Sequence, residues 1–430
     1  MAWRFLLTAF LLAVVVASAV ACGGDDDDDD TSADDDADDD STDDDDDTSD
    51  DDTTDDDIGG DIMISAYTQI VPSELMPEEV APQDANNNLD VVEHEGRYYL
   101  AFRTGPFHFA SPDVVMYVVS SDDQVNWEYE TEFTMERDLR EPRLLSFDGK
   151  LFLYFALLGE SAFDFEPGGM MVSERKGAGD WTEPVPVEEE IGYIPWRTKA
   201  IDGVPYMIAY EGGGSIYDFV GDPEPIKVHW LTTEDGYDWS AVDPEHEVVL
   251  EGGNSETDWV FLDDGSLVAV TRNEAGDEFG WGSKICRADA DNLGDWQCAG
   301  DPKKYDSPLV FRTQDNRVFL IGRRNVTEDG LYDLGRDDLS ETLQGIYYEL
   351  AYWVKPKRCS LWSVDPETLS VDFVLDLPSS GDTCFAGIID YGDDTFEVYN
   401  YTSPPTQGDL WWIQGQLAPT FIYRLTLTIP

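Results

Sequence analysis

The sequence predicts an all-β fold, a six-bladed β-propeller, on three observations. A hairpin of two alternating apolar strands around a tight turn occurs six times in the 430 residues. The copies recur with a period of about 50 residues, and no long helical pattern lies between most of them. In the clearest copies a third strand, a polar turn and a Trp follow the hairpin. Such repeats are typical of propeller blades, each built from four strands.

Residues 1–21 predict a secretory signal peptide. Arg4 precedes an apolar run, Phe5 to Val16, that is too short to span a membrane, and small residues follow it. The stretch Ala19-Val20-Ala21-Cys22 resembles a bacterial lipobox, although Leu is usual at the position of Ala19. We therefore expect export and lipidation of Cys22, in the periplasm or at the cell surface. The alternative is an ordinary signal peptide cleaved after Ala21.

Residues 22–60 begin with this Cys and continue almost entirely with Asp, Ser and Thr. A self-repelling segment without aromatic residues cannot bury enough apolar surface to offset its ordering entropy, so we expect a disordered linker. The chain carries 92 acidic and 26 basic residues. This charge disfavours nucleic acid as a partner, because phosphate binding needs positive charge. We expect a monomer that contacts the membrane only through its lipid.

Residues 61–430 form the predicted propeller, and the turns of its hairpins place the blades. Gly or a related residue supplies the positive φ at each tip. The turns are Glu95-Gly96, Asp148-Gly149, Asp202-Gly203, Asp264-Gly265, Asp315-Asn316 and Tyr391-Gly392. The last interval contains an insertion in which Leu339 to Trp353 fits a short helix, with Ser340 as its cap. We expect residues 61–71 to close the ring beside residues 421–429.

Two stretches, Ser120 to Trp127 and Thr232 to Trp239, resemble the Asp box Ser-x-Asp-x-Gly-x-x-Trp. In that box the carboxylate binds the backbone of the turn and the Trp packs between strands. This alignment places Gln124 at the Gly position of the first copy. It places Thr232 and Glu234 at the Ser and Asp positions of the second.

Four cysteines besides Cys22 predict two disulfides in an exported domain. The sequence alone allows three pairings. Nearest-neighbour pairing is favoured here, Cys286 with Cys298 and Cys359 with Cys384. We expect no metal and no other cofactor, because the chain has no CxxC motif and its four His are scattered.

The order of hairpins and boxes resembles the bacterial sialidase-like superfamily over nearly all of residues 61–430. Three segments are similar to that family: Leu139-Arg140-Glu141-Pro142-Arg143-Leu144, the Glu256 to Arg272 hairpin, and Gly381 to Gly387. The resemblance implies a glycan-directed hydrolase. Sialidases of this fold use a Tyr nucleophile activated by a Glu, an Asp acid/base and three Arg that bind the substrate carboxylate.

In this resemblance Glu256 and Arg272 correspond to the activating Glu and to the second Arg. They open and close one hairpin, so both charges lie at the same rim. Second-strand ends of other blades also bring polar groups to the central funnel, where guanidinium groups bind carboxylates well. The candidate substrate-binding residues are Arg272, Arg103, Arg197, Arg323 and Arg324. For each of them the alternative is a structural ion pair.

Two departures from the family bear on activity. Asn86 to Asn88 replace the first Arg, and Phe385 stands where the Tyr nucleophile is expected but has no hydroxyl. Tyr401 on the adjacent strand is the candidate substitute. Carboxylates at or near first-strand starts suit a glycosidase of another type. The candidate catalytic residues are Glu256, Asp90, Glu141 and Tyr401, with Asp138 as a further carboxylate.

Three functional hypotheses follow. The first is a lipid-anchored exo-glycosidase that acts on glycans, including acidic sugars, and the second is a catalytically inactive propeller that binds glycan or protein at the cell surface. The third is a five-bladed glycoside hydrolase in which one hairpin is peripheral. Trp196, Tyr210 and Trp259 are either sugar-stacking platforms or, as is more common in propellers, inter-blade core.

Overall fold

The structure of the protein is a computed structural model that describes residues 62–161, 167–187, 192–212 and 225–430. The predicted signal peptide, the lipidation site at Cys22 and the acidic linker lie outside the described residues. Within the part of the chain that is described, no helix combines the length and apolarity needed to cross a membrane.

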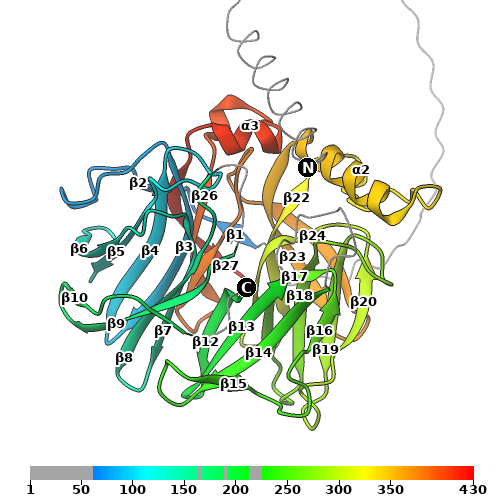
Figure 1. The fold of residues 1–430 in the computed structure, drawn as a ribbon, viewed down its shortest axis with the longest axis horizontal. Coiled ribbons are helices and arrows are strands. Elements are labelled where there is room, and N and C mark those ends of the chain that lie inside the picture. The colour runs from blue at the N-terminus through cyan, green and yellow to red at the C-terminus, as the bar shows by residue number, and fades with distance from the viewer. Residues whose placement is uncertain (1–61, 162–166, 188–191, 213–224) are drawn as a thin grey trace, which may run out of the picture. The chain divides into compact units, whose positions relative to one another are not determined.

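Six antiparallel sheets form the blades of a propeller, and the chain passes from one sheet to the next in sequence order (Figure 1). Blade 1 contains β3 (Ala85–His94), β4 (Arg97–Gly105), β5 (Val115–Ser121) and β6 (Glu128–Phe133). Blade 2 contains β7 (Leu139–Phe147), β8 (Lys150–Leu157), β9 (Gly169–Gly177), β10 (Asp180–Trp181) and β11 (Val185–Pro186). Blade 3 contains β12 (Ile194–Ile201), β13 (Val204–Gly212), β14 (Ile226–Thr233), β15 (Trp239–Ala241) and β16 (Leu250–Gly252).

The last three blades repeat the plan. Blade 4 contains β17 (Asn254–Phe261), β18 (Leu267–Asn273), β19 (Ser283–Ala288) and β20 (Gln297–Asp301). Blade 5 contains β21 (Asp306–Arg312), β22 (Val318–Asn325), β23 (Lys357–Asp365) and β24 (Ser370–Asp376). Blade 6 contains β25 (Gly387–Asp390), β26 (Thr395–Thr402) and β27 (Phe421–Thr428). Each of the six predicted hairpins forms the first two strands of one sheet, so the six-bladed prediction is confirmed and the five-bladed alternative is wrong.

The first three hairpins can be located from the sequence because their turn residues have a characteristic conformation. Both turn residues have positive φ, 52° and 79° at Glu95 and Gly96, and 50° and 68° at Asp148 and Gly149. Turns with two positive φ values twist in the same sense as the strands that they join. The Gly at each second position adopts that conformation without a steric penalty.

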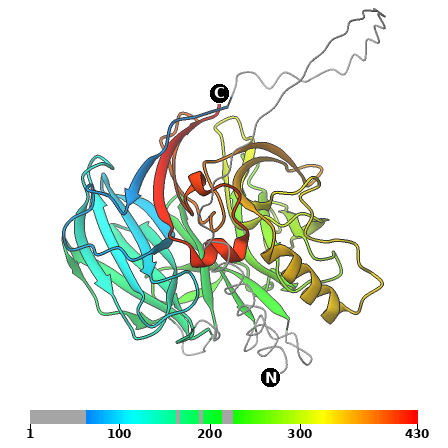
Figure 2. The same ribbon diagram turned by 90° about the horizontal axis from the view of Figure 1, so that it is seen from above.

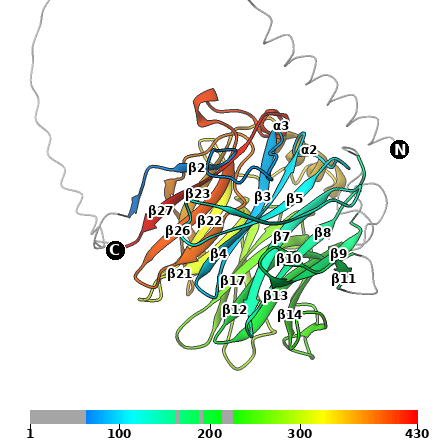
Figure 3. The ribbon, with the colours of Figure 1, turned by 90° about the vertical axis from the view of Figure 1, so that its left-hand side faces the viewer.

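The N-terminal strands complete blade 6 and close the ring. Both β1 (Met63–Ile64) and β2 (Thr68–Val71) pair antiparallel with β27, in the register Met63 with Thr428. Figures 2 and 3 show these strands beside β27. The predicted closure is confirmed.

The predicted helix in the blade 5 insertion is also present. It is α2 (Glu341–Trp353), which begins two residues later than expected and contacts the short helix α3 (Trp412–Leu417) at the top of Figure 1. Ser340 occupies the N-cap position, but its side chain makes no capping hydrogen bond. The helix is therefore held by packing of its buried face, which includes Tyr348 and Tyr352.

Apolar side chains fill the spaces between adjacent blades and also cross the propeller axis. Trp196, Tyr210 and Trp259 are all buried, at most 3% exposed, so these residues are core and not sugar platforms. Trp196 of blade 3 meets Phe385 of blade 6 edge to face, with ring centres 5.2 Å apart. Phe385, at the position where the family has its Tyr, is therefore a packing residue at the axis.

The two Asp boxes are present, and Gln124 and Gly236, which the alignment placed at the Gly position, have positive φ, but the bonding hydroxyl and carboxylate lie one residue later than aligned. Asp123 Oδ1 accepts hydrogen bonds from the backbone N–H groups of Val125 (2.9 Å) and Asn126 (2.8 Å). Asp235 does the same in the second copy. The hydroxyl position belongs to Ser121 and Thr233, so the assignment of Thr232 and Glu234 to the Ser and Asp positions is wrong.

Candidate active site at the mouth of the propeller

The end of the propeller where first strands begin and second strands end is called the mouth here. In blades 1 to 5 the first strand changes register close to its mouth end. Such bulges re-aim side chains and are common beside active sites. The bulged stretches contain Asn88, Glu141, Trp196, Glu256 and Ser307. Two of the predicted catalytic carboxyls, Glu141 and Glu256, therefore lie where the backbone departs from regular pairing.

Glu256 and Arg272 form the expected ion pair across the mouth of the blade 4 hairpin. Arg272 Nη1 lies 2.8 Å from Glu256 Oε1. The other oxygen, Oε2, accepts a 2.7 Å hydrogen bond from the backbone N–H of Ser307 in blade 5. Burial raises the pKa of Glu256 to about 7, an effect that Arg272 opposes and the charges of Asp306 and Glu141 increase. A carboxyl with this pKa can both give and take a proton near neutral pH.

Glu141 approaches the same space from blade 2. Its backbone is in the left-handed region, with φ 53°, and its Oε2 accepts a 3.2 Å hydrogen bond from the side chain of Asn88. Burial raises the pKa of Glu141, and the charges of Arg143 and Arg140 partly oppose this. The charge of Glu141 in turn contributes to the raised pKa of Glu256.

Asp306 joins the two Arg side chains that reach the mouth from blades 4 and 5. Its Oδ2 lies 3.5 Å from Arg323 Nη2, and its Oδ1 lies 3.9 Å from Arg272 Nε. The Tyr352 hydroxyl of α2 donates to Oδ2 as well. Burial opposes ionisation of Asp306, but Lys304, Arg323 and Arg272 outweigh it and lower its pKa to about 2. Asp306 is therefore a carboxylate at any physiological pH.

Tyr401 lies at the blade 6 side of the mouth and is held by an acidic partner. Its hydroxyl donates a 2.8 Å hydrogen bond to Asp382 Oδ1, and Asp382 Oδ2 lies 2.6 Å from His108 Nδ1. Burial and the Asp382 charge raise the pKa of Tyr401 well above its usual value. The hydroxyl is thus a protonated donor toward Asp382.

Three other predicted site residues bind groups of the protein itself. Asp90 Oδ2 accepts a 2.8 Å hydrogen bond from the backbone N–H of Leu144, which ties blade 1 to blade 2. Arg103 is fully buried and donates a 2.9 Å hydrogen bond to Asp138. Arg324 points to the opposite face of β22 and pairs with Asp376 at 2.7 Å, because successive strand residues alternate between faces.

Arg197 crosses the propeller axis. Its guanidinium donates to the carbonyls of Ala386 in blade 6 (3.3 Å) and Pro308 in blade 5 (3.0 Å), and lies 3.3 Å from Asp258 in blade 4. It therefore ties blade 3 to three other blades.

Arg143 lies beside Arg197 and contacts two aromatic rings. Its Cζ atom is 4.4 Å from the ring centre of Phe385 and 4.9 Å from the ring centre of Trp196. None of its three guanidinium nitrogens has a hydrogen-bond partner among the described residues. Burial lowers the pKa of Arg143 to about 10. The charge of Arg197 lowers this pKa further, and the charges of Asp90 and Glu141 oppose the fall.

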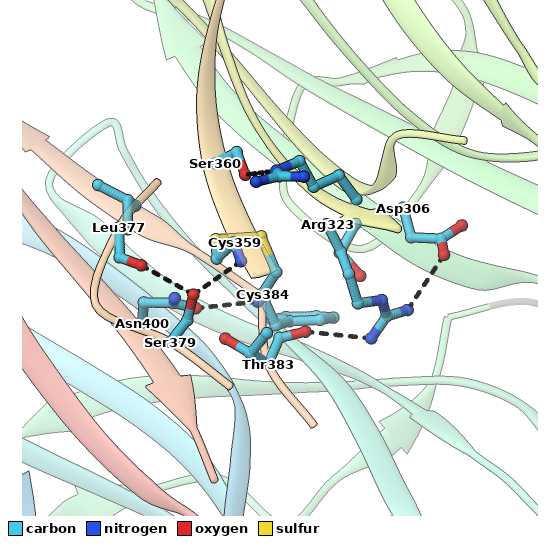
Figure 4. Close-up of a disulfide and its surroundings, with 12 residues drawn as sticks. Asp306, Arg323, Cys359, Ser360, Leu377, Ser379, Thr383, Cys384 and Asn400 are labelled. Carbon is cyan, nitrogen blue, oxygen red and sulfur yellow. Dashed lines mark hydrogen bonds and ion pairs between the residues drawn. A yellow bond between two sulfur atoms is a disulfide. The ribbon is translucent and has the colours of Figure 1, made fainter. Parts of the chain in front are cut away.

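Both predicted disulfides are present, Cys286–Cys298 and Cys359–Cys384. The second joins β23 to the loop before β25, and Figure 4 shows it next to Arg323 and Asp306. In that loop the carbonyl of Thr383 accepts a 3.1 Å hydrogen bond from Arg323 Nη1. The disulfide thus fixes one wall of the mouth.

Sequence reasoning missed Asp306, Asp382 and His108. Asp306 was recoverable, because it opposes Arg323 at the mouth end of the blade 5 hairpin in nearly the way that Glu256 opposes Arg272 in blade 4. His108 and Asp382 come from loops without a repeated pattern. Within the described residues, no group of three or more His, Cys, Asp and Glu side chains is arranged to hold a metal ion.

No protein-family model and no curated protein sequence matches the chain. Among solved structures it is similar to a protein of unknown function from Dyadobacter fermentans, with TM-score 0.55 and 16% identity over 80% of this chain and 95% of that one. It is also similar to Trypanosoma rangeli sialidase in complex with the inhibitor DANA, with TM-score 0.53 and 11% identity over 85% of this chain and 60% of the sialidase. This chain thus spans less than two thirds of the sialidase. At these identities the likeness shows the fold alone, a sialidase-type six-bladed propeller.

Proposed function

We propose that the protein is a glycoside hydrolase whose active site is the mouth of the propeller. The observation that carries this proposal is the convergence of Glu141 and Glu256. They come from blades 2 and 4, both lie in first-strand bulges, and burial raises the pKa of both. Glycoside hydrolysis generally needs two such carboxyls, one to transfer a proton and one to act while ionised.

The surroundings of each carboxyl suit one of these roles. Glu256, with a pKa of about 7, is the proton donor and acceptor. Glu141 takes the role of the ionised partner, since Arg143 and Arg140 oppose the rise that burial causes in its pKa. Tyr401, whose hydroxyl is engaged by Asp382, shapes the blade 6 wall and contacts the substrate. Arg272 positions Glu256 through their 2.8 Å ion pair.

The test is turnover of a panel of neutral glycosides, uronides and sialosides by the full chain and by three variants. Glu256→Gln and Glu141→Gln should each lower kcat/KM by roughly 100-fold or more, the usual contribution of an acid–base group. Glu174→Gln is the matched control, because Glu174 has the same 7% exposure as Glu256 but binds Tyr237 on the outer part of blades 2 and 3. Full activity of both mouth variants on every substrate would refute the proposal.

A second candidate function is a catalytically inactive propeller that binds glycans at its mouth. Phe385 favours it, since this ring packs on Arg143 and offers no nucleophile. The same panel separates the two functions. Glycan binding without turnover in the wild-type chain, weakened by Arg272→Ala, would establish the binding role.

We also propose export and lipid anchoring at Cys22. The lipobox-like stretch Ala19 to Cys22 supports the anchor, and the two disulfides support an oxidising compartment. In a bacterial host, the full chain should fractionate with membranes and the Cys22→Ala variant should not. Mass spectrometry of the N-terminal peptide tests acylation directly, and an unmodified Cys22 in the membrane fraction would contradict the proposal.

A further inference from the structure

The two Arg side chains that reach the mouth from adjacent blades already share a carboxylate. Arg272 ends β18 and Arg323 lies near the end of β22, and both approach Asp306 at the start of β21. Asp306 is only 1% exposed, and the Tyr352 hydroxyl closes it off from the side of α2. Two guanidinium groups and a hydroxyl around one carboxylate are the arrangement by which proteins bind a ligand carboxylate.

The charges near this carboxylate are balanced by the protein itself. Arg272 also pairs with Glu256 at 2.8 Å and with Glu274 at 2.6 Å. Lys304 lies 3.5 Å from Glu274 and 3.9 Å from Asp306. Arg272, Lys304 and Arg323 therefore already have Asp306, Glu274 and the titrating carboxyl of Glu256 as partners. A further carboxylate from a substrate would have to compete with these carboxyl groups, and burying it beside Asp306 would be unfavourable.

The other Arg residues near the mouth are also buried. Arg103 and Arg140 share the carboxylate of Asp138 and are at most 7% exposed. Arg143 is fully buried beneath the rings of Phe385 and Trp196, so no substrate reaches it without displacing them. The whole chain has a formal net charge of −66, which further repels an anionic sugar.

We propose that Asp306 fills the carboxylate position between Arg272 and Arg323, so that the mouth accepts uncharged glycans in preference to sialic or uronic acids. The assignment of substrate class rests on the proposed function of the mouth. That Asp306 fills the carboxylate position is inferred only from its contacts with Arg272, Arg323 and Tyr352. It differs from the expectation of an acidic sugar, which was drawn from the Arg residues without their carboxylate partners.

The first experiment needs no enzymatic activity. Asp306→Ala removes the carboxylate and leaves space between the two guanidinium groups, whereas Asp306→Asn removes the charge but fills the space. Melting temperatures of the full chain are measured with formate or acetate and with chloride at matched ionic strength. We expect formate to restore most of the lost melting temperature of Asp306→Ala, with no comparable shift for wild type or Asp306→Asn. Equal effects of formate and chloride on Asp306→Ala would overturn the proposal.

The second experiment addresses the substrate class, first in the wild-type chain and then in Asp306→Ala. Each neutral pyranoside is paired with the uronide that differs from it only by the carboxylate, and sialosides are included. We expect the neutral member to bind more tightly in each pair that binds, and Asp306→Ala to reverse the preference. Tighter binding of uronides or sialosides to the wild type would overturn the substrate class. Formate rescue without binding of any sugar would refute the glycan function and leave the role of Asp306 standing.

Discussion

The Glu256 carboxyl of blade 4 accepts a 2.7 Å hydrogen bond from the backbone N–H of Ser307 in blade 5. Its other oxygen binds Arg272 of its own blade. The orientation of this carboxyl is thus set by two blades at once, and its position depends on how they pack. Ser307 itself has φ 53°, so a bulge in one blade aims a donor at the carboxyl of its neighbour.

The first prediction concerns pH. An acid whose pKa is raised by folding stabilises the folded state fully below its unfolded pKa and loses that contribution as pH rises through the folded value. For Glu256 the window runs from 4.5 to about 7. Across it the free energy of unfolding should fall by up to about 3 kcal/mol, at 1.36 kcal/mol for each pKa unit. Denaturant titrations at several pH values measure this fall.

Glu256→Gln should flatten the pH dependence in that window. Glu174→Gln should not, because the pKa of Glu174 is lowered by Lys176 and Tyr237 against its burial, and its contribution changes below 4.5. Asp306, with a pKa of about 2, also titrates below this window. Identical slopes for wild type and Glu256→Gln between pH 5 and 7 would show that Glu256 is not perturbed.

A second prediction compares the two Arg residues at the axis. Arg197→Met should destabilise the protein by about 3 kcal/mol, because Asp258 loses a partner and the carbonyls of Ala386 and Pro308 lose their donor. Arg143→Met should destabilise it by less than half as much, since it removes ring contacts and a buried charge but no hydrogen bond to a described residue. Urea unfolding gives both values, and the reverse ranking would contradict this account.

The third prediction separates the two disulfides. Replacing either pair with Ala should destabilise the protein by about 3 kcal/mol, because the cross-links close loops of similar length, with sequence separations of 12 and 25. Only the loss of Cys359–Cys384 should also impair the mouth, since it frees the loop that carries Asp382 and Thr383. We expect at least a tenfold lower kcat/KM for that variant and little change for the Cys286–Cys298 variant. Equal kinetic effects would argue against a role for the loop.

The fourth prediction tests the register of the Asp boxes. Asp235→Ala should lower the melting temperature more than Glu234→Ala, and Asp123→Ala more than Asp122→Ala. Asp235 and Asp123 accept two backbone N–H groups each, whereas Asp122 makes only a surface ion pair with Arg97. Differential scanning calorimetry of the four variants decides the matter. Equal losses of melting temperature within each pair of variants would contradict the assignment of the bonding carboxylates to Asp123 and Asp235.

The fold was predictable because each blade repeats a local signal. Turn residues such as Asp148 and Gly149 fix a hairpin without reference to the rest of the chain, and ring closure follows from the repeat count and from the apolar pattern of residues 421–429. The register of the Asp boxes was missed by one residue because both Asp122 and Asp123 fit the pattern. Only the hydrogen bonds of Asp123 distinguish them.

The site was predictable only in part. The predicted hairpin correctly placed Glu256 beside Arg272, since both residues lie on one repeat unit. Strand position alone could not show that Arg197 extends across the axis to blades 5 and 6, or that Arg324 turns away from the mouth. The reach of Arg197 depends on a bulge and on inter-blade distances, which a sequence pattern does not encode, and the alternation along β22 shows only that Arg323 and Arg324 point to opposite faces, not which of them faces the mouth.

The pairing of the N-terminal strands with β27 also determines which way the propeller faces. Met63 pairs with Thr428, which lies opposite Thr395 at the beginning of β26, whereas Tyr401 and the mouth lie at the other end of that strand. The chain therefore joins the propeller on the face remote from the mouth. The N-terminal end of the described chain is thus separated from Tyr401 by the length of β26.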